Sequence, residues 1–368
     1  MLTRRSTPIR SPAEHLIILG GTPTAIAVAR DARRLGVKTS VLDVDGGVIR
    51  HSSAVDNYVA CEDFDDALAV LERIDNARWL IADSDHWLRF IVENSSLLPH
   101  ATILHPAAPI VNICLNKVRF GQWCRDSGFR CPSVVDPDNP EIPFPVVVRP
   151  NQTRHRESDA PKARVARNRR ELEACLHEFQ RVQADYVITE ALIGPSAHYL
   201  SVGFARRGDG EMLAFAIEKT RPPIERCGGA SFVQSCDVPQ AVELASLVAS
   251  QMNFVGIGEM EFVSYDGDLS IVELNPRPWL QYGLGRALGL SLLGFAALGQ
   301  PQPEPSGKAT WVNLGTDAYW CLSRSEGLVW RGQLPFRRFV AQVCAADCRL
   351  LWDRRDPLPL LLHLVSRR

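Results

Sequence analysis

Two adjacent β-strands with carboxylates in their interiors restrict the fold of this chain more than any other feature. Residues 258–279 read "GEMEFVSYDGDLSIVELNPRPW", which is two short apolar runs around a turn signal. Side chains alternate between the two faces of a strand, so Glu259 and Glu261 share one face of the first run. Glu273 and Asn275 share one face of the second run in the same way. A sheet face that is normally apolar therefore carries charge here.

The turn decides whether the acidic residues of both strands meet on the same face. We predict a three-residue loop at residues 266–268, with its glycine in the left-handed conformation. This register places Glu261 opposite Glu273. A two-residue turn would pair Glu261 with Val272 and put the carboxylates on opposite faces. Like charges that face each other destabilise a sheet, so we expect positive charge between them.

Composition limits the class of protein. The 368 residues are enough for two or three packed units, and the net charge of −1 does not favour a nucleic-acid partner. The longest apolar runs are too short to span a bilayer, so we expect no membrane partner. Residues 1–14 are basic and are interpreted as a disordered leader, not a signal peptide. Ten cysteines without a CxxC pattern predict reduced thiols and a cytoplasmic protein.

The order of the elements predicts an α/β fold. Residues 15–47 read as strand, glycine turn, helix and strand, which is the opening of a parallel sheet. The helix is expected from Thr24 to Leu35. The turn lacks the GxGxxG spacing, which argues against a dinucleotide site. Further along the chain we expect a hairpin turning near Asp209 and a helical section after residue 300.

The acidic hairpin has the chemistry of a metal site. Glu261 and Glu273 with the amide oxygen of Asn275 form a set of hard oxygen donors, which suits Mg²⁺ or Mn²⁺. The alternative is a solvated sheet face with ordinary salt bridges. Arg277 lies two residues beyond Asn275 and adds a cation on that face, a combination that suits a polyphosphate bound with Mg²⁺. No GxxxxGK[ST] motif occurs, which excludes a P-loop nucleotide site on sequence grounds.

Several segments together resemble the ATP-grasp superfamily of carboxylate–amine ligases. The segments are "LNKVRFGQWCRDSGFRCPS", "FPVVVRPN", "VITEALIGP", "GEMEFV" with "IVELNPRPW", and "WDRRDPLPLLLHL". The resemblance is greatest to the branch that contains D-aspartate ligase and many uncharacterised ATP-grasp proteins. It covers almost the whole chain.

The resemblance implies an ATP-grasp fold in four parts. These parts are a Rossmann-like pre-ATP-grasp domain at residues 15–115, a helix, linker and small α+β lid at 116–192, a central mixed-sheet domain with the metal hairpin at 193–300, and a C-terminal helical section at 301–368.

It also implies roles for particular residues. The metal ligands would be Glu261, Glu273 and Asn275. Catalytic cations would be Arg277, which would hold the transferred phosphoryl group, and Lys219 and Arg221, which would face the acceptor or the acyl phosphate. ATP would be bound by Lys117, Arg149 and Glu190 together with the backbone of Ala191 and Leu192.

The implied reaction is ATP-dependent formation of an amide or peptide bond through an acyl phosphate, with ATP and Mg²⁺ or Mn²⁺ bound. The partners would be a small carboxylate and a small amine, and a homodimer is compatible with this reading. The sequence departs from the resemblance at Asn116, where relatives have aspartate, and at residues 151–166, a basic segment without glycine. These departures keep an alternative open, namely a nucleotide-binding module without ligase activity.

Overall fold

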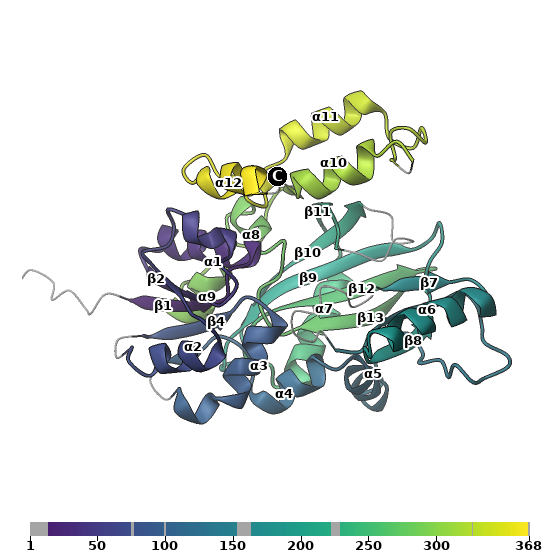
Figure 1. Cartoon of the computed structure of the whole chain (residues 1–368), viewed down its shortest axis with the longest axis horizontal. Helices are drawn as coiled ribbons and strands as arrows, with labels where there is room; N and C mark the ends of the chain where they lie inside the picture. Colours follow the sequence, from purple (N-terminus) through teal and green to yellow (C-terminus); the bar gives the residue numbers. More distant parts are fainter. Residues whose placement is uncertain are drawn as a thin grey trace, which may run out of the picture.

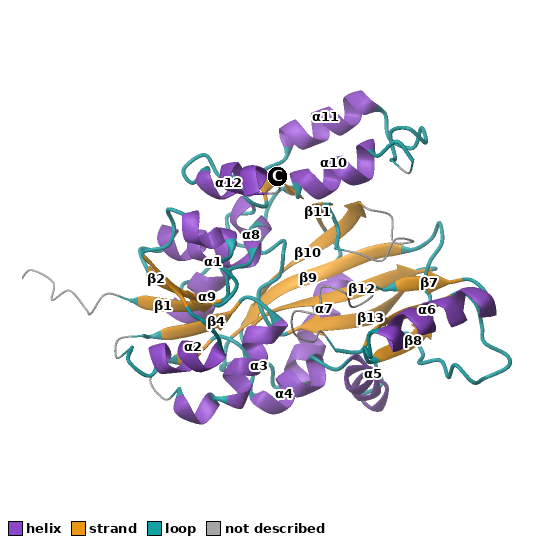
Figure 2. Ribbon diagram, viewed as in Figure 1, coloured by secondary structure: helices purple, strands orange, loops and turns teal. Residues whose placement is uncertain are grey.

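The structure is a computed structural model in which strands form the centre and helices cover them (Figures 1 and 2). It describes residues 14–74, 77–98, 101–152, 163–221, 229–325 and 327–366. Residues 1–13 of the predicted leader and residues 153–162 of the predicted basic segment lie outside the described residues, so neither prediction is tested there.

The N-terminal part is a parallel sheet of five strands in the order β3-β2-β1-β4-β5. Its strands are β1 (His15–Leu19), β2 (Lys38–Asp43), β3 (Asn57–Ala60), β4 (Trp79–Ala82) and β5 (Thr102–Ile103). Its helices are α1 (Pro23–Arg34), α2 (Phe64–Leu71), α3 (Asp85–Glu93) and α4 (Ala108–Cys114), with short 3₁₀ turns η1 (Val48–His51) and η2 (Ser95–Leu97). The predicted strand–helix–strand opening is confirmed.

Helix α1 begins and ends where its sequence signals predict. The Thr22 side chain accepts a hydrogen bond from the Thr24 backbone N–H at 3.2 Å, and Pro23 occupies the first helical position, where its missing N–H costs nothing. After α1, Gly36 adopts a φ of +72°, a conformation that glycine reaches without steric cost.

A small α+β unit follows helix α5 (Lys117–Asp126). Its antiparallel sheet has the order β7-β6-β8, and α6 (Arg169–Arg181) covers one face. The strands are β6 (Val146–Pro150), β7 (Arg164–Ala166) and β8 (Tyr186–Glu190). We call β6, β7, β8 and α6 the lid unit.

The central sheet has seven strands in the order β13-β12-β9-β10-β11-β14-β15. The strands are β9 (His198–Arg206), β10 (Met212–Arg221), β11 (Phe232–Cys236), β12 (Gly256–Tyr265), β13 (Asp268–Asn275), β14 (Thr310–Val312) and β15 (Cys348–Arg349). The helices that follow or pack on it are α7 (Pro239–Gln251), α8 (Leu284–Ala287), α9 (Leu292–Leu298), α10 (Leu314–Leu322), α11 (Phe336–Ala345) and α12 (Leu358–Ser366).

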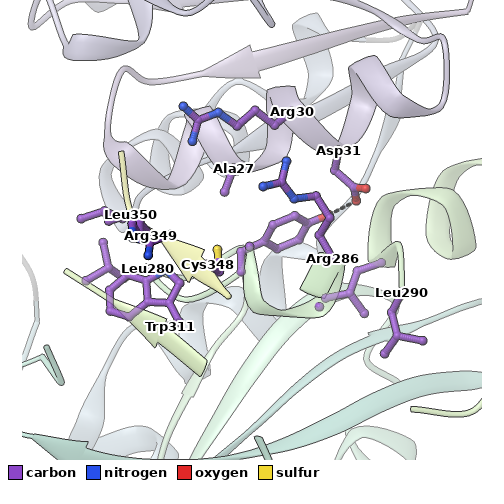
Figure 3. Close-up of a pocket in the computed structure, with 14 residues that line it drawn as sticks. Ala27, Arg30, Asp31, Leu280, Arg286, Leu290, Trp311, Cys348, Arg349 and Leu350 are labelled. Carbon is purple, nitrogen blue, oxygen red and sulfur yellow. Dashed lines mark hydrogen bonds between the residues drawn. The ribbon is translucent and has the colours of Figure 1, made fainter. Parts of the chain in front are cut away.

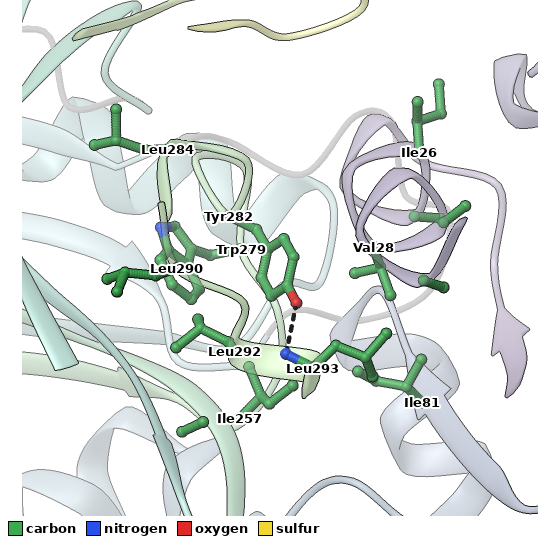
Figure 4. Close-up of a cluster of buried hydrophobic side chains, with 14 of the residues drawn as sticks. Ile26, Val28, Ile81, Ile257, Trp279, Tyr282, Leu284, Leu290, Leu292 and Leu293 are labelled. Atoms are coloured by element: carbon green, nitrogen blue, oxygen red, sulfur yellow. Dashed lines mark hydrogen bonds between the residues drawn. The ribbon is translucent and has the colours of Figure 1, made fainter. Parts of the chain in front are cut away.

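One apolar core joins the N-terminal and central sheets. Val28 of α1 points toward the segment after β13, where Trp279 and Tyr282 are buried (Figure 4). The Tyr282 hydroxyl donates to Asp31 of α1 at 2.9 Å, and the dashed line in Figure 3 marks this bond. Because this polar contact is buried, it fixes the orientation of α1 on the central sheet.

The acidic hairpin has the predicted register but a different turn. Tyr265 pairs with Asp268, so the loop contains only Asp266 and Gly267, both with positive φ (50° and 88°). The pairing slips by one residue between Glu261 and the next strand position, where a β-bulge lies. The bulge compensates for the shorter turn, and the predicted three-residue loop is wrong while the predicted pairing is right.

The section after residue 300 was predicted to be helical. It also contains two strands, β14 and β15, which extend the central sheet beyond β11. The predicted α/β class, with a Rossmann-like sheet, a small α+β unit and a central mixed sheet, is confirmed. No helix in the described ranges is long and apolar enough to cross a bilayer.

Candidate active site

The acidic row lies on one face of the edge of the central sheet. Glu261 of β12 pairs directly with Glu273 of β13, and Glu259 pairs with Asn275. The Asn275 side-chain amide donates to a Glu259 carboxylate oxygen at 3.2 Å. Strand β9 lies on the other side of β12 and presents Ser201 opposite Glu261. Two adjacent strands therefore present three carboxylates and one carboxamide in a compact group.

Three cations from different parts of the chain neutralise these carboxylates. The Lys219 Nζ atom of β10 lies 2.9 Å from Glu261 and 3.8 Å from Glu259. The Glu273 carboxylate lies 3.4 Å from the Lys117 Nζ atom and 3.7 Å from an Arg149 nitrogen. The positive charge expected between the acidic strands is therefore supplied by side chains of α5, β6 and β10.

Burial and these charges shift the pKa values of the group. Burial raises the pKa of Glu259 to about 7, because the Lys219 charge offsets only part of the desolvation. Burial also acts to raise the pKa of Glu273, but the charges of Lys117 and Arg149 outweigh it and lower that pKa. Burial acts to lower the pKa of Lys219, yet the Glu261 and Glu259 charges raise it. Lys219 thus stays protonated and Glu273 ionised near neutral pH.

Backbone contacts fix the two cations that approach Glu273. Lys117 is the first residue of α5, and its N–H donates to the Asn151 carbonyl at 3.1 Å. The Asn116 side chain caps the same helix by accepting from the Arg119 N–H at 2.9 Å. An aspartate at position 116 would cap the helix equally well, so asparagine at this position leaves Lys117 in place. Arg149 lies on β6 and also contacts the Val272 carbonyl.

A cavity of about 470 Å³ lies between the lid unit and the central sheet. At one end are the charged residues Lys117, Arg149, Lys219, Glu261 and Glu273. The remaining wall is mostly apolar and includes Val147, Leu192, Ile193, Tyr199 and Val263. A cavity of this size with charge at one end suits a small polar ligand that carries a flat apolar group.

The predicted adenine segment borders this cavity. Glu190 and Leu192 line it, and Glu190 is the last residue of β8. The Ala191 N–H already donates to the Pro145 carbonyl at 3.1 Å, and the Leu192 carbonyl accepts from the Tyr199 hydroxyl at 2.9 Å. Among the described residues, the Ala191 carbonyl and the Leu192 N–H have no backbone hydrogen-bond partner, which leaves one acceptor and one donor free in this segment.

Arg277 does not line the cavity and lies where the acidic hairpin meets the N-terminal sheet. Its Nε atom lies 2.5 Å from Asp85 at the start of α3. Burial acts to lower the pKa of Arg277, but the Asp85 charge raises it. Glu259 and Asp83 are also near enough to add to this effect. The row of charges therefore continues from Glu261 to the N-terminal domain.

The structure does not bring Arg221 to this group. A β-bulge between Lys219 and Arg221 turns the arginine toward the C-terminal helices. There it makes two hydrogen bonds of 3.0 Å to Asp317, which is fully buried, and one of 2.7 Å to Gln342. The resemblance to ATP-grasp ligases implied that Lys219 and Arg221 face one site, but the bulge between them turns the two side chains in different directions. Arg221 has the environment of a structural residue.

Two residues of this charged group, Glu259 and Asp85, were not predicted as site residues from the sequence. Glu259 was visible in the alternation of β12, two residues before Glu261 and opposite Asn275. Asp85 follows β4, at the carboxyl end of a strand beside the point where the strand order reverses. Ligands of parallel sheets bind at such points, so this rule is the signal that would have found it.

The donor set is suited to a hard divalent cation, although the described residues contain no cluster of three or more His, Cys, Asp or Glu in metal-binding geometry. Glu261 and Glu273 offer oxygens from adjacent strands, and a buried oxygen of Glu259 has no hydrogen-bond partner. Asn275 adds an amide oxygen beside them. Oxygen-only donors suit Mg²⁺ or Mn²⁺ better than zinc.

Three parts together define the ATP-grasp fold: the N-terminal parallel sheet, the lid unit, and the central sheet. The cavity lies between the lid unit and the central sheet, and the likeness to solved structures supports this fold. N5-carboxyaminoimidazole synthetase from Staphylococcus aureus, complexed with ADP, superposes with a TM-score of 0.68 at 14% identity over 85% of each chain. The ADP complex of purK, an N5-carboxyaminoimidazole ribonucleotide synthetase, gives 0.65 at 18% identity over 82% of each chain.

L-amino acid ligase from Bacillus licheniformis has a TM-score of 0.64 at 15% identity, over 82% of this chain and 79% of that one. No protein-family model and no curated protein sequence matches the chain. The likenesses therefore concern the fold, which is the ATP-grasp fold.

Proposed function

We propose that this protein is an ATP-dependent ligase that joins a small carboxylate to a small amine and requires Mg²⁺ or Mn²⁺. The observation that carries the proposal is the charged end of the 470 Å³ cavity. There, the facing carboxylates Glu261 and Glu273 lie among Lys117, Arg149 and Lys219. Carboxylates for a divalent cation and cations for phosphate oxygens are the two requirements of phosphoryl transfer.

The cavity supports one orientation of ATP. The adenine would lie along the apolar wall near Val147 and Leu192, with the Ala191 carbonyl and the Leu192 N–H as its edge contacts. The triphosphate would reach Lys117 and Arg149 at the charged end. Arginine can grip two phosphate oxygens at once, and lysine acts as a point charge.

The chain's own residues supply charge and position for the reaction. A divalent cation held by Glu261, Glu273 and Asn275 would supply charge neutralisation between the phosphates when bound. Lys117 and Arg149 would orient the phosphates, and Lys219 would balance charge beside Glu261. In the reaction a substrate carboxylate oxygen attacks the terminal phosphorus, ADP leaves, and the amine then displaces phosphate and loses a proton.

The resemblance of the sequence to the D-aspartate ligase branch suggests amino-acid substrates, and the likeness to L-amino acid ligase agrees with this class. Arg277 and Asp85 would border the substrate side of the site, between the hairpin and α3. A cytoplasmic location and assembly as a homodimer complete the proposal.

A nucleotide-binding module without ligase activity is the second candidate. The feature that favours it is the glycine-free segment 151–166, where many ATP-grasp relatives close a glycine-rich loop over the phosphates. Such a module would bind Mg²⁺-ATP without releasing ADP.

ADP release measured against pairs of amino acids and other small acids separates the two candidates. The ligase requires ADP release that depends on both a carboxylate and an amine. The Glu273→Gln variant should remove it, whereas Glu243→Gln, on the exposed side of α7, should not. ATP binding without ADP release for any pair would support the module instead.

A further inference from the structure

A second large cavity lies at the other end of the molecule from the lid unit. It has a volume of about 1120 Å³ and shares no residue with the ATP cavity. It lies where the carboxyl end of α1, residues 53–54, Arg286 of α8 and the turn at 353–356 come together. In Figure 1, α1 and α12 lie on the left and the lid unit lies on the right.

Arginine dominates the lining of this cavity. The six arginines are Arg30, Arg33, Arg34, Arg286, Arg354 and Arg355. The acidic residues of the lining are Asp353 and Asp356. The cavity therefore holds an excess of four positive charges in a chain whose net charge is −1.

Three of the six arginines make contacts within the wall of the cavity. Arg30 is buried and pairs with Asp356 at 3.0 Å, and Arg286 pairs with Asp353 at 2.6 Å. Arg33 donates to the Ser53 carbonyl. Figure 3 shows Arg30 and Arg286 on the two elements that meet here. Both aspartates are therefore already neutralised within the wall.

The turn at residues 353–356 is held rigidly. Asp356 is buried and accepts from the Ser52 hydroxyl at 2.6 Å and from the Ser53 N–H at 2.8 Å. Arg30 also donates to the carbonyls of Leu351 and Asp356, at 2.9 and 3.0 Å. The arginines beside this turn are thus carried on a fixed backbone, which lowers the entropy cost of gathering them around a ligand.

The other three arginines have no ion-pair partner among the described residues, although the charge of Arg34 also acts on Asp31. Among the described residues, the side chains of Arg34, Arg354 and Arg355 make no salt bridge and no hydrogen bond, and all three are exposed. Guanidinium groups that face one cavity repel each other, and a multivalent anion removes this repulsion. Each guanidinium can also bind two oxygens of a phosphate or carboxylate.

We propose that this cavity binds a small multivalent anion, either a polyphosphate-bearing or a polycarboxylate metabolite, separately from the ATP site. Its volume is sufficient for a ligand of nucleotide size. The anion would join α1 of the N-terminal sheet to the turn near the C-terminal end of the chain. The site is independent of the ligase proposal, because it uses no residue of the ATP cavity.

Isothermal titration calorimetry with inorganic tripolyphosphate and with citrate, without nucleotide or Mg²⁺, tests the site. The titrations are compared at constant ionic strength set with KCl, so that general screening is equal. The Arg34→Gln/Arg355→Gln double variant should bind at least about tenfold more weakly, the effect of losing one charged hydrogen bond. The relative affinity for the two probes identifies phosphate or carboxylate as the preferred group.

Two further variants serve as controls. Arg337→Gln/Arg338→Gln removes two exposed arginines from α11 and should leave binding unchanged. Arg149→Ala disables the phosphate end of the ATP cavity and should leave one binding event intact. The proposal is overturned if neither probe binds the wild type, if the α11 variant weakens binding as much, or if Arg149→Ala abolishes it.

Discussion

Two cations two residues apart on β10 have opposite surroundings. Lys219 faces the carboxylates of β12, whereas Arg221 lies against Asp317 of α10 and over the ring of Phe232 at 4.1 Å. The bulge between them separates their directions. At the scale of single residues, charge alone thus does not identify a catalytic residue. The extra residue of the β-bulge changes the direction in which the side chain points.

Arg221→Ala should destabilise the fold rather than affect the chemistry directly. It would leave the carboxylate of Asp317 buried and unpaired, which typically costs about 3–5 kcal/mol. The double variant Arg221→Met/Asp317→Leu should recover much of this loss, since no buried charge is left. Urea unfolding followed by circular dichroism measures the free energy of unfolding of both variants. A fully stable Arg221→Ala protein that has lost ADP release would instead restore the catalytic role.

Arg149 should contribute to ATP binding through both its charge and its shape. Arg149→Ala should weaken ATP binding by more than about tenfold, the value of a charged hydrogen bond. Arg149→Lys should retain part of the affinity, because the charge stays but the two-pronged contact is lost. Calorimetric titration with ATP measures the three affinities, which should decrease from the wild type to Arg149→Lys to Arg149→Ala. Equal affinities for the wild type and both variants would make Arg149 a partner of Glu273 only.

At the scale of elements, the hairpin of β12 and β13 determines the site by combining a tight turn with a bulge. The predicted three-residue loop placed Glu261 opposite Glu273, and the structure has this pairing. The turn was mispredicted because sequence alone does not distinguish a three-residue loop from a two-residue loop followed by a bulge. The three-residue loop places the extra residue in the loop and the bulge places it in the second strand, so the pairing beyond the bulge is the same.

The two-residue turn makes Gly267 necessary. Its φ of +88° is strained for any branched side chain, although a Cβ atom there would meet no neighbour within 4 Å. Gly267→Val should therefore lower the free energy of unfolding by about 1–2 kcal/mol through backbone strain alone. Gly208→Val is the matched control, since that glycine also has open space but no positive φ. Equal losses in the two variants, measured by urea unfolding, would contradict the turn assignment.

At the scale of the whole molecule, the site depends on contacts between distant parts of the chain. Arg277 and Asp85 are 192 residues apart, and Lys117 and Glu273 come from different units. The sequence indicated Glu261, Glu273 and Lys117 through alternation and motif resemblance. It gave no sign that Asp85 pairs with Arg277, because that contact exists only when the N-terminal sheet packs on the central one.

We expect His105 to make the stability of this packing depend on pH. It follows β5 beside the Leu104 carbonyl, which accepts from the Ile257 N–H of β12, and burial lowers its pKa from 6.5 to about 4. Between pH 4 and 6.5 the unfolded chain binds a proton here that the folded protein does not. Stability should therefore rise with pH across this window and be lost as the pH falls through it.

His105→Gln isolates this effect, because glutamine does not titrate. The free energy of unfolding of the wild type minus that of the variant should increase by about 3 kcal/mol from pH 4 to pH 6.5, as a shift of this size implies. Urea unfolding at several pH values provides the comparison. A difference that is constant with pH would show that His105 does not titrate differently in the folded protein.

The central claim is that Glu261 and Glu273 make ATP binding depend on a divalent cation, and calorimetric titration of ATP with and without Mg²⁺ tests it most directly. In the wild type Mg²⁺ should strengthen ATP binding. In Glu273→Gln this gain should fall at least about tenfold. Binding without Mg²⁺ should be undiminished or stronger, because Lys117 and Arg149 lose a competing carboxylate. Glu243→Gln should behave as the wild type. An unchanged Mg²⁺ gain in a folded Glu273→Gln protein would contradict the account.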